Sequence, residues 1–183
     1  MSKKEFKQSE TLIIVALEEE FPRDLMTGWR VVYSGVGKVN ALIGLSKAIL
    51  ENRPKTIINF GTAGSSDPNL KGIKEVTTFK QRDMDVRSLG FNIGETPFDD
   101  INDINLDRPG LSCGTGDSFI SSKQNIDTDL FDMEAYAIAK FCLHNDLDFY
   151  CYKFVSDNAN DEAGQDWKKN VSNGAMEFKR ILE

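Results

Sequence analysis

The sequence contains few of the residues that carry nucleophilic catalysis. One histidine and three cysteines occur among its 183 residues. A serine or cysteine nucleophile with a histidine base would therefore have to use His144. This residue lies near the end of a predicted helix, where a cationic side chain interacts favourably with the helix dipole, so we expect it to be structural. Acid–base chemistry is then expected from carboxylates.

Metal-ligand spacing and long apolar runs are also absent from the sequence. Cys113, Cys142 and Cys151 are widely separated, which favours reduced structural thiols and no metal or cofactor. The apolar-leaning stretch at residues 11–17 ends at three consecutive glutamates. It is too short for a signal peptide or a membrane span. We therefore expect a cytoplasmic protein with no membrane partner.

The charge balance excludes a strongly basic surface. Lys and Arg total 22 against 29 Asp and Glu, a formal net charge of −7. Without a clustered basic stripe, the chain is a poor candidate for nucleic-acid binding. Apolar residues make up 40% and charged residues 28%, as in ordinary globular proteins. We expect a polar tail at residues 1–10 and one domain at residues 11–183.

The hydrophobic pattern predicts strands that alternate with helices. Continuous apolar runs of this length are typical of strands covered on both faces. Predicted strands cover residues 12–17, 31–33, 56–60, 74–79, 111–113 and 149–155. Predicted helices cover residues 38–51, 134–144 and a last stretch in which Trp167, Val171, Ala175, Phe178 and Leu182 recur at helical spacing. This order predicts an α/β sheet with helices on its faces.

Polar residues gather where the predicted strands end. Residues 18–20, 61–64, 116–118, 132–134 and 156–157 each follow an apolar stretch, and residues 61–64 are expected to form a glycine loop. In open α/β sheets, ligands bind outside the carboxyl ends of the strands. The carboxylates are therefore predicted to meet in one cleft. Helix capping is the alternative for each position taken alone.

A possible phosphate-binding motif at residues 35–38, Gly-Val-Gly-Lys, fails on inspection. Val32 occupies the place of the leading glycine of a P-loop, and Val39 replaces the Ser or Thr that binds the metal. We reject the P-loop interpretation for this segment.

An ordered set of short segments gives the sequence a specific resemblance. The segments are ALEEE at 16–20, SGVGKV at 34–39, NFGTAG at 59–64, GDSFI at 116–120, DMEA at 132–135 and SD at 156–157. Together they resemble the methylthioadenosine/S-adenosylhomocysteine nucleosidases of the purine nucleoside phosphorylase superfamily. The resemblance implies a three-layer α/β/α fold with a central mixed, largely parallel twisted sheet. It also implies hydrolysis of the N-glycosidic bond of adenine nucleosides.

The resemblance assigns catalytic roles to three carboxylates. Glu20 would deprotonate the attacking water, Glu134 would hold the ribose hydroxyls, and Asp157 would protonate purine N7. Adenine leaves poorly as an anion, and a positioned acid typically contributes about 10²–10⁴-fold to the rate. Asp157 must then be protonated while Glu20 is ionised, so we predict that burial and nearby negative charge raise the pKa of Asp157.

Further residues of the resemblance would contact the base and the sugar. Phe119 would stack on the purine, and the backbone of Ile120 would read its edge. Met133 would pack against the ribose, and Ser156 would position Asp157.

The remaining matches surround the water, the ribose and the 5′ substituent. Thr62, which stands where the family more often has serine, would lie near the water and ribose, and the substrate-binding set also includes Ala63 and Gly64. Leu17, Val36 and Trp167 match apolar positions around the 5′ group. Leu89 matches a residue that comes from the neighbouring subunit in the family, which implies a homodimer.

Several alternatives to this function stay open. Residues 18–20 would repel a phosphate dianion, which favours hydrolysis, but Arg23 and Arg30 nearby keep phosphorolysis possible. Asp157 suggests a 6-aminopurine by resemblance. The chain is short for the family before Gly35 and before Gly116, so another purine or deazapurine nucleoside remains an alternative substrate. A non-catalytic nucleoside-binding module is a further alternative.

Overall fold

One mixed sheet connects the strands of the chain. The computed structural model describes residues 5–120 and 126–183. Its strands are β1 (Thr11–Val15), β2 (Arg30–Tyr33), β3 (Thr56–Gly64), β4 (Ile73–Gln81), β5 (Ile104–Asn105), β6 (Leu111–Thr115), β7 (Leu130–Asp132) and β8 (Asp148–Asp157). Five of the eight strand pairings are parallel, as the largely parallel sheet requires.

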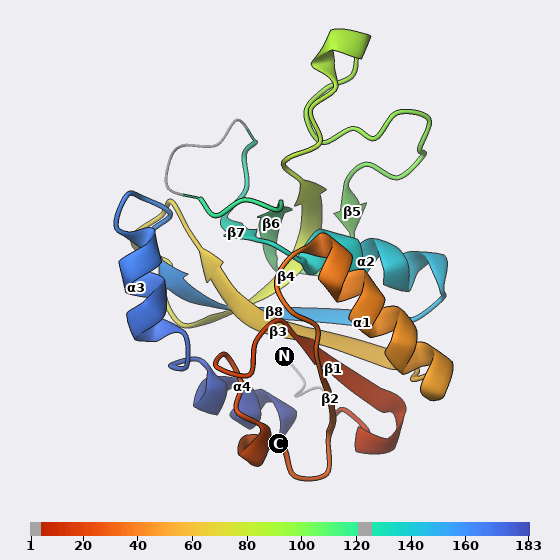
Figure 1. Cartoon of the computed structure of the whole chain (residues 1–183), viewed down its shortest axis with the longest axis vertical. Coiled ribbons are helices and arrows are strands. Elements are labelled where there is room, and N and C mark those ends of the chain that lie inside the picture. The colour runs from red at the N-terminus through yellow and green to blue at the C-terminus, as the bar shows by residue number, and fades with distance from the viewer. Residues whose placement is uncertain (1–4, 121–125) are drawn as a thin grey trace.

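The helices lie before, between and after these strands (Figure 1). They are α1 (Lys38–Glu51), α2 (Ala135–His144), α3 (Ala163–Asn170) and α4 (Ala175–Leu182), with short 3-10 turns η1 (Gln8–Glu10), η2 (Arg23–Met26) and η3 (Arg87–Leu89). The predicted helix at residues 38–51 coincides with α1. In the described ranges, every helix is too short or too polar to cross a membrane.

The middle of the sheet closes on itself. Strand β3 pairs with both β7 and β8, β8 also pairs with β4, and β6 joins β4 to β7. The five strands β3, β7, β6, β4 and β8 therefore form a ring. Strands β1 and β2 extend the sheet from β3, and β5 adds to β4. Sequence patterns predicted most of these strands but gave no signal of the closure.

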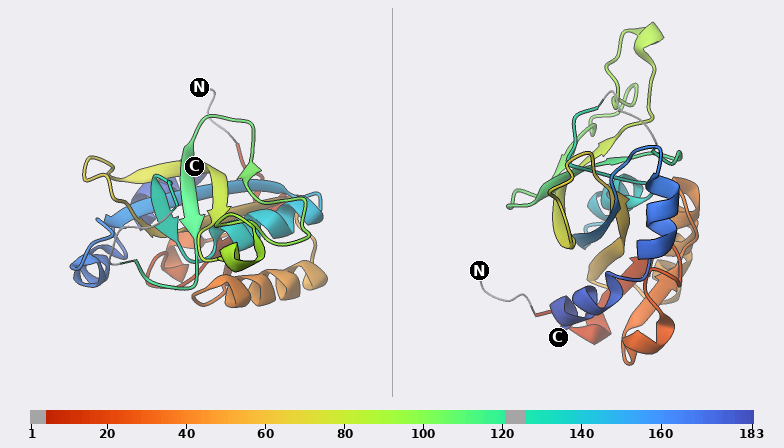
Figure 2. Two further views of the ribbon diagram at one scale, coloured as in Figure 1. Left: turned by 90° about the horizontal axis from the view of Figure 1, so that it is seen from above. Right: turned by 90° about the vertical axis from the view of Figure 1, so that its left-hand side faces the viewer.

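Two hydrophobic layers cover the two faces of the sheet. All five residues of β1 are buried, and the four apolar ones alternate between the layers. Leu12 and Ile14 pack with α1 and α2, whereas Ile13 and Val15 pack with η2 and α4. Figure 2 gives two further views of this arrangement. A continuous apolar run thus marks a strand covered on both faces, as predicted from the sequence.

The predicted continuous helix at the end of the chain is wrong. The chain forms α3 and α4, separated by turns at residues 171–174. A Cβ on Gly174 would lie 2.5 Å from the Cβ of Phe154, so glycine allows the backbone to approach β8 closely there. The Asn170 side chain also donates a hydrogen bond to the carbonyl of Ser156 at 2.9 Å. Contacts with β8 therefore break the helix although the helical spacing of apolar residues continues.

The glycine loop predicted at residues 61–64 is also wrong. Strand β3 continues through this segment to Gly64, because β8 pairs with it along its length. The paired strand carries Thr62, Ala63 and Gly64 to the end of the sheet.

Most of the chain from residue 82 to 110 lies outside the sheet, which it rejoins only at β5. It contains only η3 and the two-residue strand β5 as regular structure. Figures 1 and 2 show the part around η3 extending beyond the rest of the molecule.

Replacement of Phe178 is predicted to destabilise the layer formed by α4. This side chain is fully buried, stacks on Phe60 at 4.2 Å between ring centroids and meets Phe21 edge-on at 5.1 Å. Phe178→Ala is expected to lower the free energy of unfolding by about 3–5 kcal/mol in urea titrations. Met176→Ala, at a half-exposed position of the same helix, is the control and should change it by less than about 0.5 kcal/mol. Equal effects of the two substitutions would contradict this packing.

Candidate active site

A cleft lies where several strands end, and it brings the predicted residues together. It encloses about 190 Å³. Every site residue predicted from the sequence lines it except Leu89. The cleft also contains residues to which the sequence assigned no individual role: Ala16, Arg82, Ser118, Phe131 and Asp132. The predicted meeting of Glu20, Glu134 and Asp157 around one cavity is therefore observed.

Glu20 is held in one orientation by backbone and hydroxyl donors. Its side chain is buried, and Oε1 accepts hydrogen bonds from the Thr62 backbone N–H and hydroxyl, both at 2.7 Å. Its Oε2 accepts a hydrogen bond from the backbone N–H of Leu17 at 3.2 Å. The indole N–H of Trp167 donates to Thr62 Oγ1 at 2.9 Å. Segments from three parts of the chain thus fix this carboxylate at the cleft.

Glu134 immediately precedes α2 and is also buried. The backbone N–H of Gly37 donates to its Oε1 at 2.8 Å. The next N–H, that of Lys38, donates to Asp117 Oδ1 at 2.8 Å. Two backbone donors of the rejected P-loop-like segment therefore bind carboxylates of the protein itself. Burial and the nearby charge of Asp132 raise the pKa of Glu134 to about 8.

Asp157 ends β8 and faces the same cleft. Its Oδ1 accepts the backbone N–H of Ala159 at 2.9 Å, and the Ser156 hydroxyl lies 2.8 Å from Oδ2. A Cβ on residue 64 would lie 2.6 Å from Oδ1, so Gly64 leaves room for this carboxyl. Burial raises the pKa of Asp157, and the charge of Asp166 adds to the rise. The upward shift of the Asp157 pKa agrees with the direction predicted from the sequence.

A buried ion pair lies below these carboxylates. Lys153 Nζ is 2.8 Å from Asp132 Oδ2, and the two side chains are 1% and 0% exposed. Burial disfavours both charges, but their mutual attraction outweighs it, so the pKa of Asp132 is lowered and that of Lys153 is raised. Within the described residues, Lys153 Nζ has no other hydrogen-bond partner. Sequence reasoning missed this pair, although a lysine within an apolar strand was a usable signal.

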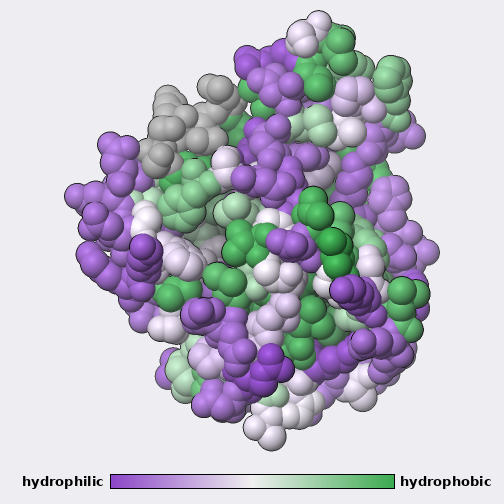
Figure 3. Space-filling view, viewed as in Figure 1, coloured by the Kyte–Doolittle hydropathy of each residue, from purple (hydrophilic) through white to green (hydrophobic). Residues whose placement is uncertain are grey.

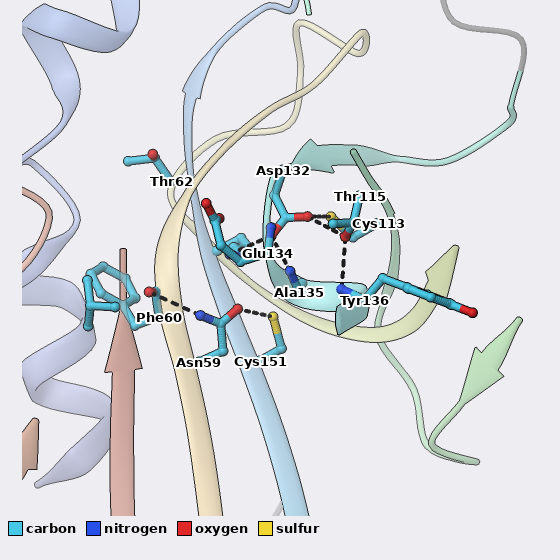
Figure 4. A network of polar contacts seen from close by, with 12 residues as sticks. Asn59, Phe60, Thr62, Cys113, Thr115, Asp132, Glu134, Ala135, Tyr136 and Cys151 are labelled. Carbon is cyan, nitrogen blue, oxygen red and sulfur yellow. Dashed lines mark hydrogen bonds and ion pairs between the residues drawn. The ribbon is translucent and has the colours of Figure 1, made fainter. Parts of the chain in front are cut away.

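Besides its pairing with Lys153, Asp132 is hydrogen-bonded to Thr115 and to the start of α2, and Figure 4 shows the latter two contacts. Its Oδ1 accepts the Thr115 hydroxyl at 2.5 Å, and its Oδ2 accepts the backbone N–H of Ala135 at 2.8 Å. The backbone N–H of Glu134 lies 3.2 Å from the same Oδ2. The orientation of Glu134 therefore depends on the position of the ion pair.

Three of the predicted positions are largely exposed to solvent. Val36 is 41% exposed and Phe119 is 51% exposed, although both line the cleft. Leu89 is 68% exposed in η3 and does not line the cleft of its own chain. Among residues 5–120 and 126–183, no group of three or more His, Cys, Asp or Glu side chains is placed to hold a metal ion.

Comparisons with known proteins point to one family. No protein-family model matches the chain. A 5′-methylthioadenosine/S-adenosylhomocysteine nucleosidase of an Exiguobacterium species is 30% identical, with 83% of this chain and 77% of the relative covered. The protein of the same name from Shewanella piezotolerans is 31% identical, with 83% and 79% covered.

Solved structures share the fold. A futalosine hydrolase mutant of Helicobacter pylori matches with a TM-score of 0.84 at 19% identity, covering 94% of this chain and 96% of that one. The Neisseria meningitidis 5′-methylthioadenosine/S-adenosylhomocysteine nucleosidase in complex with methylthio-immucillin-A matches with a TM-score of 0.80 at 23% identity, covering 94% and 96%. The nucleoside phosphorylase-like α/β fold predicted from the sequence is confirmed.

Removal of one partner of the buried ion pair is predicted to destabilise the protein strongly. Lys153→Met leaves Asp132 buried without its cation and should lower the free energy of unfolding by roughly 3–5 kcal/mol. The double variant Lys153→Met/Asp132→Asn removes both charges and should recover much of that loss. Lys179→Met is the control, because its partner Glu183 lies 3.8 Å away and both side chains are partly exposed. Urea titration measures all three, and a double variant no more stable than Lys153→Met would refute the pairing.

Proposed function

Because the chain belongs to the methylthioadenosine/S-adenosylhomocysteine nucleosidase family, we propose that it hydrolyses the N-glycosidic bond of adenine nucleosides. The observation that carries the proposal is the convergence of three carboxylates, Glu20, Glu134 and Asp157, on one cleft. They come from distant parts of the chain and differ in their surroundings. The substrates proposed are 5′-methylthioadenosine, S-adenosylhomocysteine or a related adenine nucleoside.

Asp157 is proposed as the acid that assists departure of the base. Burial raises its pKa, which makes the protonated form easier to reach than in an exposed aspartate, and that form can donate a proton or a strong hydrogen bond to purine N7. The Ser156 hydroxyl at 2.8 Å and the Ala159 N–H at 2.9 Å fix the orientation of the carboxyl. Phe119 would stack on the purine and the Ile120 backbone would read its edge.

Glu20 and Glu134 are proposed to act at the sugar. As adenine departs, positive charge develops on the ribose, and nearby negative charge can stabilise it. Glu20 would take the proton of the attacking water while its other contacts keep it in place. Glu134 would bind the ribose hydroxyls, with Met133 packed against the ring, and Leu17, Val36 and Trp167 would surround the 5′ group.

The surroundings of two arginines favour water over phosphate as the attacking group. Neither Arg23 nor Arg30 lines the cleft. Arg23 lies 3.5 Å from the exposed Glu18, and Arg30 donates to the carbonyls of Ala48 and Asn52 at the end of α1. Glu20 occupies the cleft instead, and its carboxylate would repel a phosphate dianion.

A second copy of the chain is proposed to complete the 5′ pocket. The cavity of about 190 Å³ in one chain is smaller than the roughly 300–1,000 Å³ typical of ligand pockets. Exposed apolar side chains gather over α1 (Figure 3), among them Val39 at 67%, Ile43 at 49% and Leu50 at 88% exposure. Leu89, far from its own cleft and exposed, would enter the pocket of the neighbouring subunit.

Two substitutions are predicted to separate turnover from folding. Glu20→Gln and Asp157→Asn should each slow adenine release from 5′-methylthioadenosine by about 10²–10⁴-fold in phosphate-free buffer, because each removes a proton-transfer group. Glu19→Gln changes an exposed neighbour of Glu20 and should retain the wild-type rate. Near-normal rates in both active-site variants would overturn the mechanism.

The same assay discriminates the alternatives. S-adenosylhomocysteine and adenosine test the 5′ group, and a rate that requires added phosphate would indicate a phosphorylase. Stoichiometric binding without release of base would indicate a binding module.

The dimer is predicted to depend on α1. Wild-type protein should sediment at twice the mass of the 20.5 kDa chain, because a second copy would cover the exposed apolar side chains. Val39→Ser/Ile43→Ser should shift it toward monomer and raise KM. Met176→Ser, half-exposed on α4, is the control. A monomeric wild-type protein at micromolar concentration would contradict this proposal.

A further inference from the structure

Ser118, Phe119 and Ile120 form one wall of the cleft, and the aromatic side chain of this wall has little packing to hold it. Phe119 lines the cleft but is 51% exposed, so packing against the core does not by itself hold it in place. Ile120, the next residue, is 7% exposed. The position of the Phe119 ring must therefore depend largely on the backbone of the residues that precede it.

Arg82 contacts that backbone from the neighbouring strand. It directly follows β4 and is 8% exposed. Its Nη1 donates to the Ser118 hydroxyl at 3.0 Å, and its Nη2 donates to the carbonyl of Gly116 at 2.9 Å and to that of Ser118. One guanidinium thus holds two carbonyls and a hydroxyl of the three residues that precede Phe119.

Asp83 and Lys38 hold the same segment from the other side. The backbone N–H of Asp117 donates to Asp83 Oδ2 at 2.8 Å, and Lys38 Nζ lies 2.6 Å from Asp83 Oδ1. Asp117 in turn accepts the backbone N–H of Lys38. The ends of β4 and β6 and the start of α1 are therefore tied together beside the cleft.

The packing at Gly116 leaves no room for a side chain. A Cβ there would lie 2.9 Å from Arg82 Cζ and 2.9 Å from Asp83 Cγ. Glycine therefore lets the backbone lie directly against the guanidinium. A guanidinium presents several donors in a fixed plane, which suits three acceptors at once in a way that a lysine ammonium does not.

We infer that Arg82 is a positioning residue that holds Phe119 and Ile120 in place for the purine, and so sets the affinity for the base. The inference rests on the proposed function, since it assigns the base to this wall. In this proposal Arg82 acts through its bonds to residues 116–118, and not through contact with the reacting atoms. It is therefore predicted to govern KM and adenine affinity rather than the chemical step.

The test compares adenine binding and turnover in Arg82 variants. Arg82→Ala should weaken adenine binding in calorimetry and raise KM by roughly 10- to 100-fold, because charge-assisted hydrogen bonds are lost, with kcat changed only a few-fold. Free guanidinium should restore part of the affinity, since Arg82 borders the cleft. Arg82→Lys, which keeps the charge but loses the planar donors, should show an intermediate loss and test the inference if Arg82→Ala does not fold.

Arg108→Ala is the matched control. Arg108 also pairs with a carboxylate, Glu75 at 3.0 Å, and donates to the carbonyl of Phe149, but it does not line the cleft. Its loss should lower stability without changing KM or adenine affinity. Equal adenine affinity in wild type and the folded Arg82 variants, or equal effects of Arg82→Ala and Arg108→Ala, would overturn the inference.

Failure of the proposed function gives a different result. If wild-type protein binds adenine but releases none from nucleosides, the nucleosidase proposal fails. Weaker adenine binding by the Arg82 variants would then still support the positioning role.

Discussion

The buried pair of Lys153 and Asp132 is the interaction on which the site depends. It places opposite charges 2.8 Å apart on β8 and β7, with almost no exposure of either side chain. Further hydrogen bonds help to offset the cost of burying these charges, and Asp132 accepts them from the Thr115 hydroxyl and the N–H of Ala135. The pair joins two strands of the ring. It also fixes the backbone at the start of α2, from which the side chain of Glu134 projects.

Backbone N–H groups then orient the three carboxylates at the cleft. Glu20 binds the N–H groups of Leu17 and Thr62, Glu134 binds that of Gly37, and Asp157 binds that of Ala159. Backbone groups have little freedom once the sheet has formed, so the carboxylates are positioned by the fold. Burial and the nearby charge of Asp132 raise the pKa of Glu134 to about 8, and burial also raises the pKa of Asp157.

Local patterns predicted most of the fold because they depend on local physics. The apolar face at residues 38–51 predicted α1, and the unbroken apolar run of β1 predicted a strand covered on both faces. The same reasoning failed at residues 167–182, where regular spacing continues across two helices. There the close contact of Gly174 with Phe154 decides the chain path, and periodicity carries no information about a distant strand.

By itself, the sequence determined which chemical groups follow the strands, and the resemblance it carries predicted that Glu20, Glu134 and Asp157 would meet. Only the tertiary structure decided that Lys153 pairs with Asp132 and that Arg82 binds the backbone before Phe119. The physical reason is that a charge inside an apolar strand needs a partner. Which residue becomes that partner depends on distances through space. Those distances arise when β3, β7, β6, β4 and β8 close into a ring.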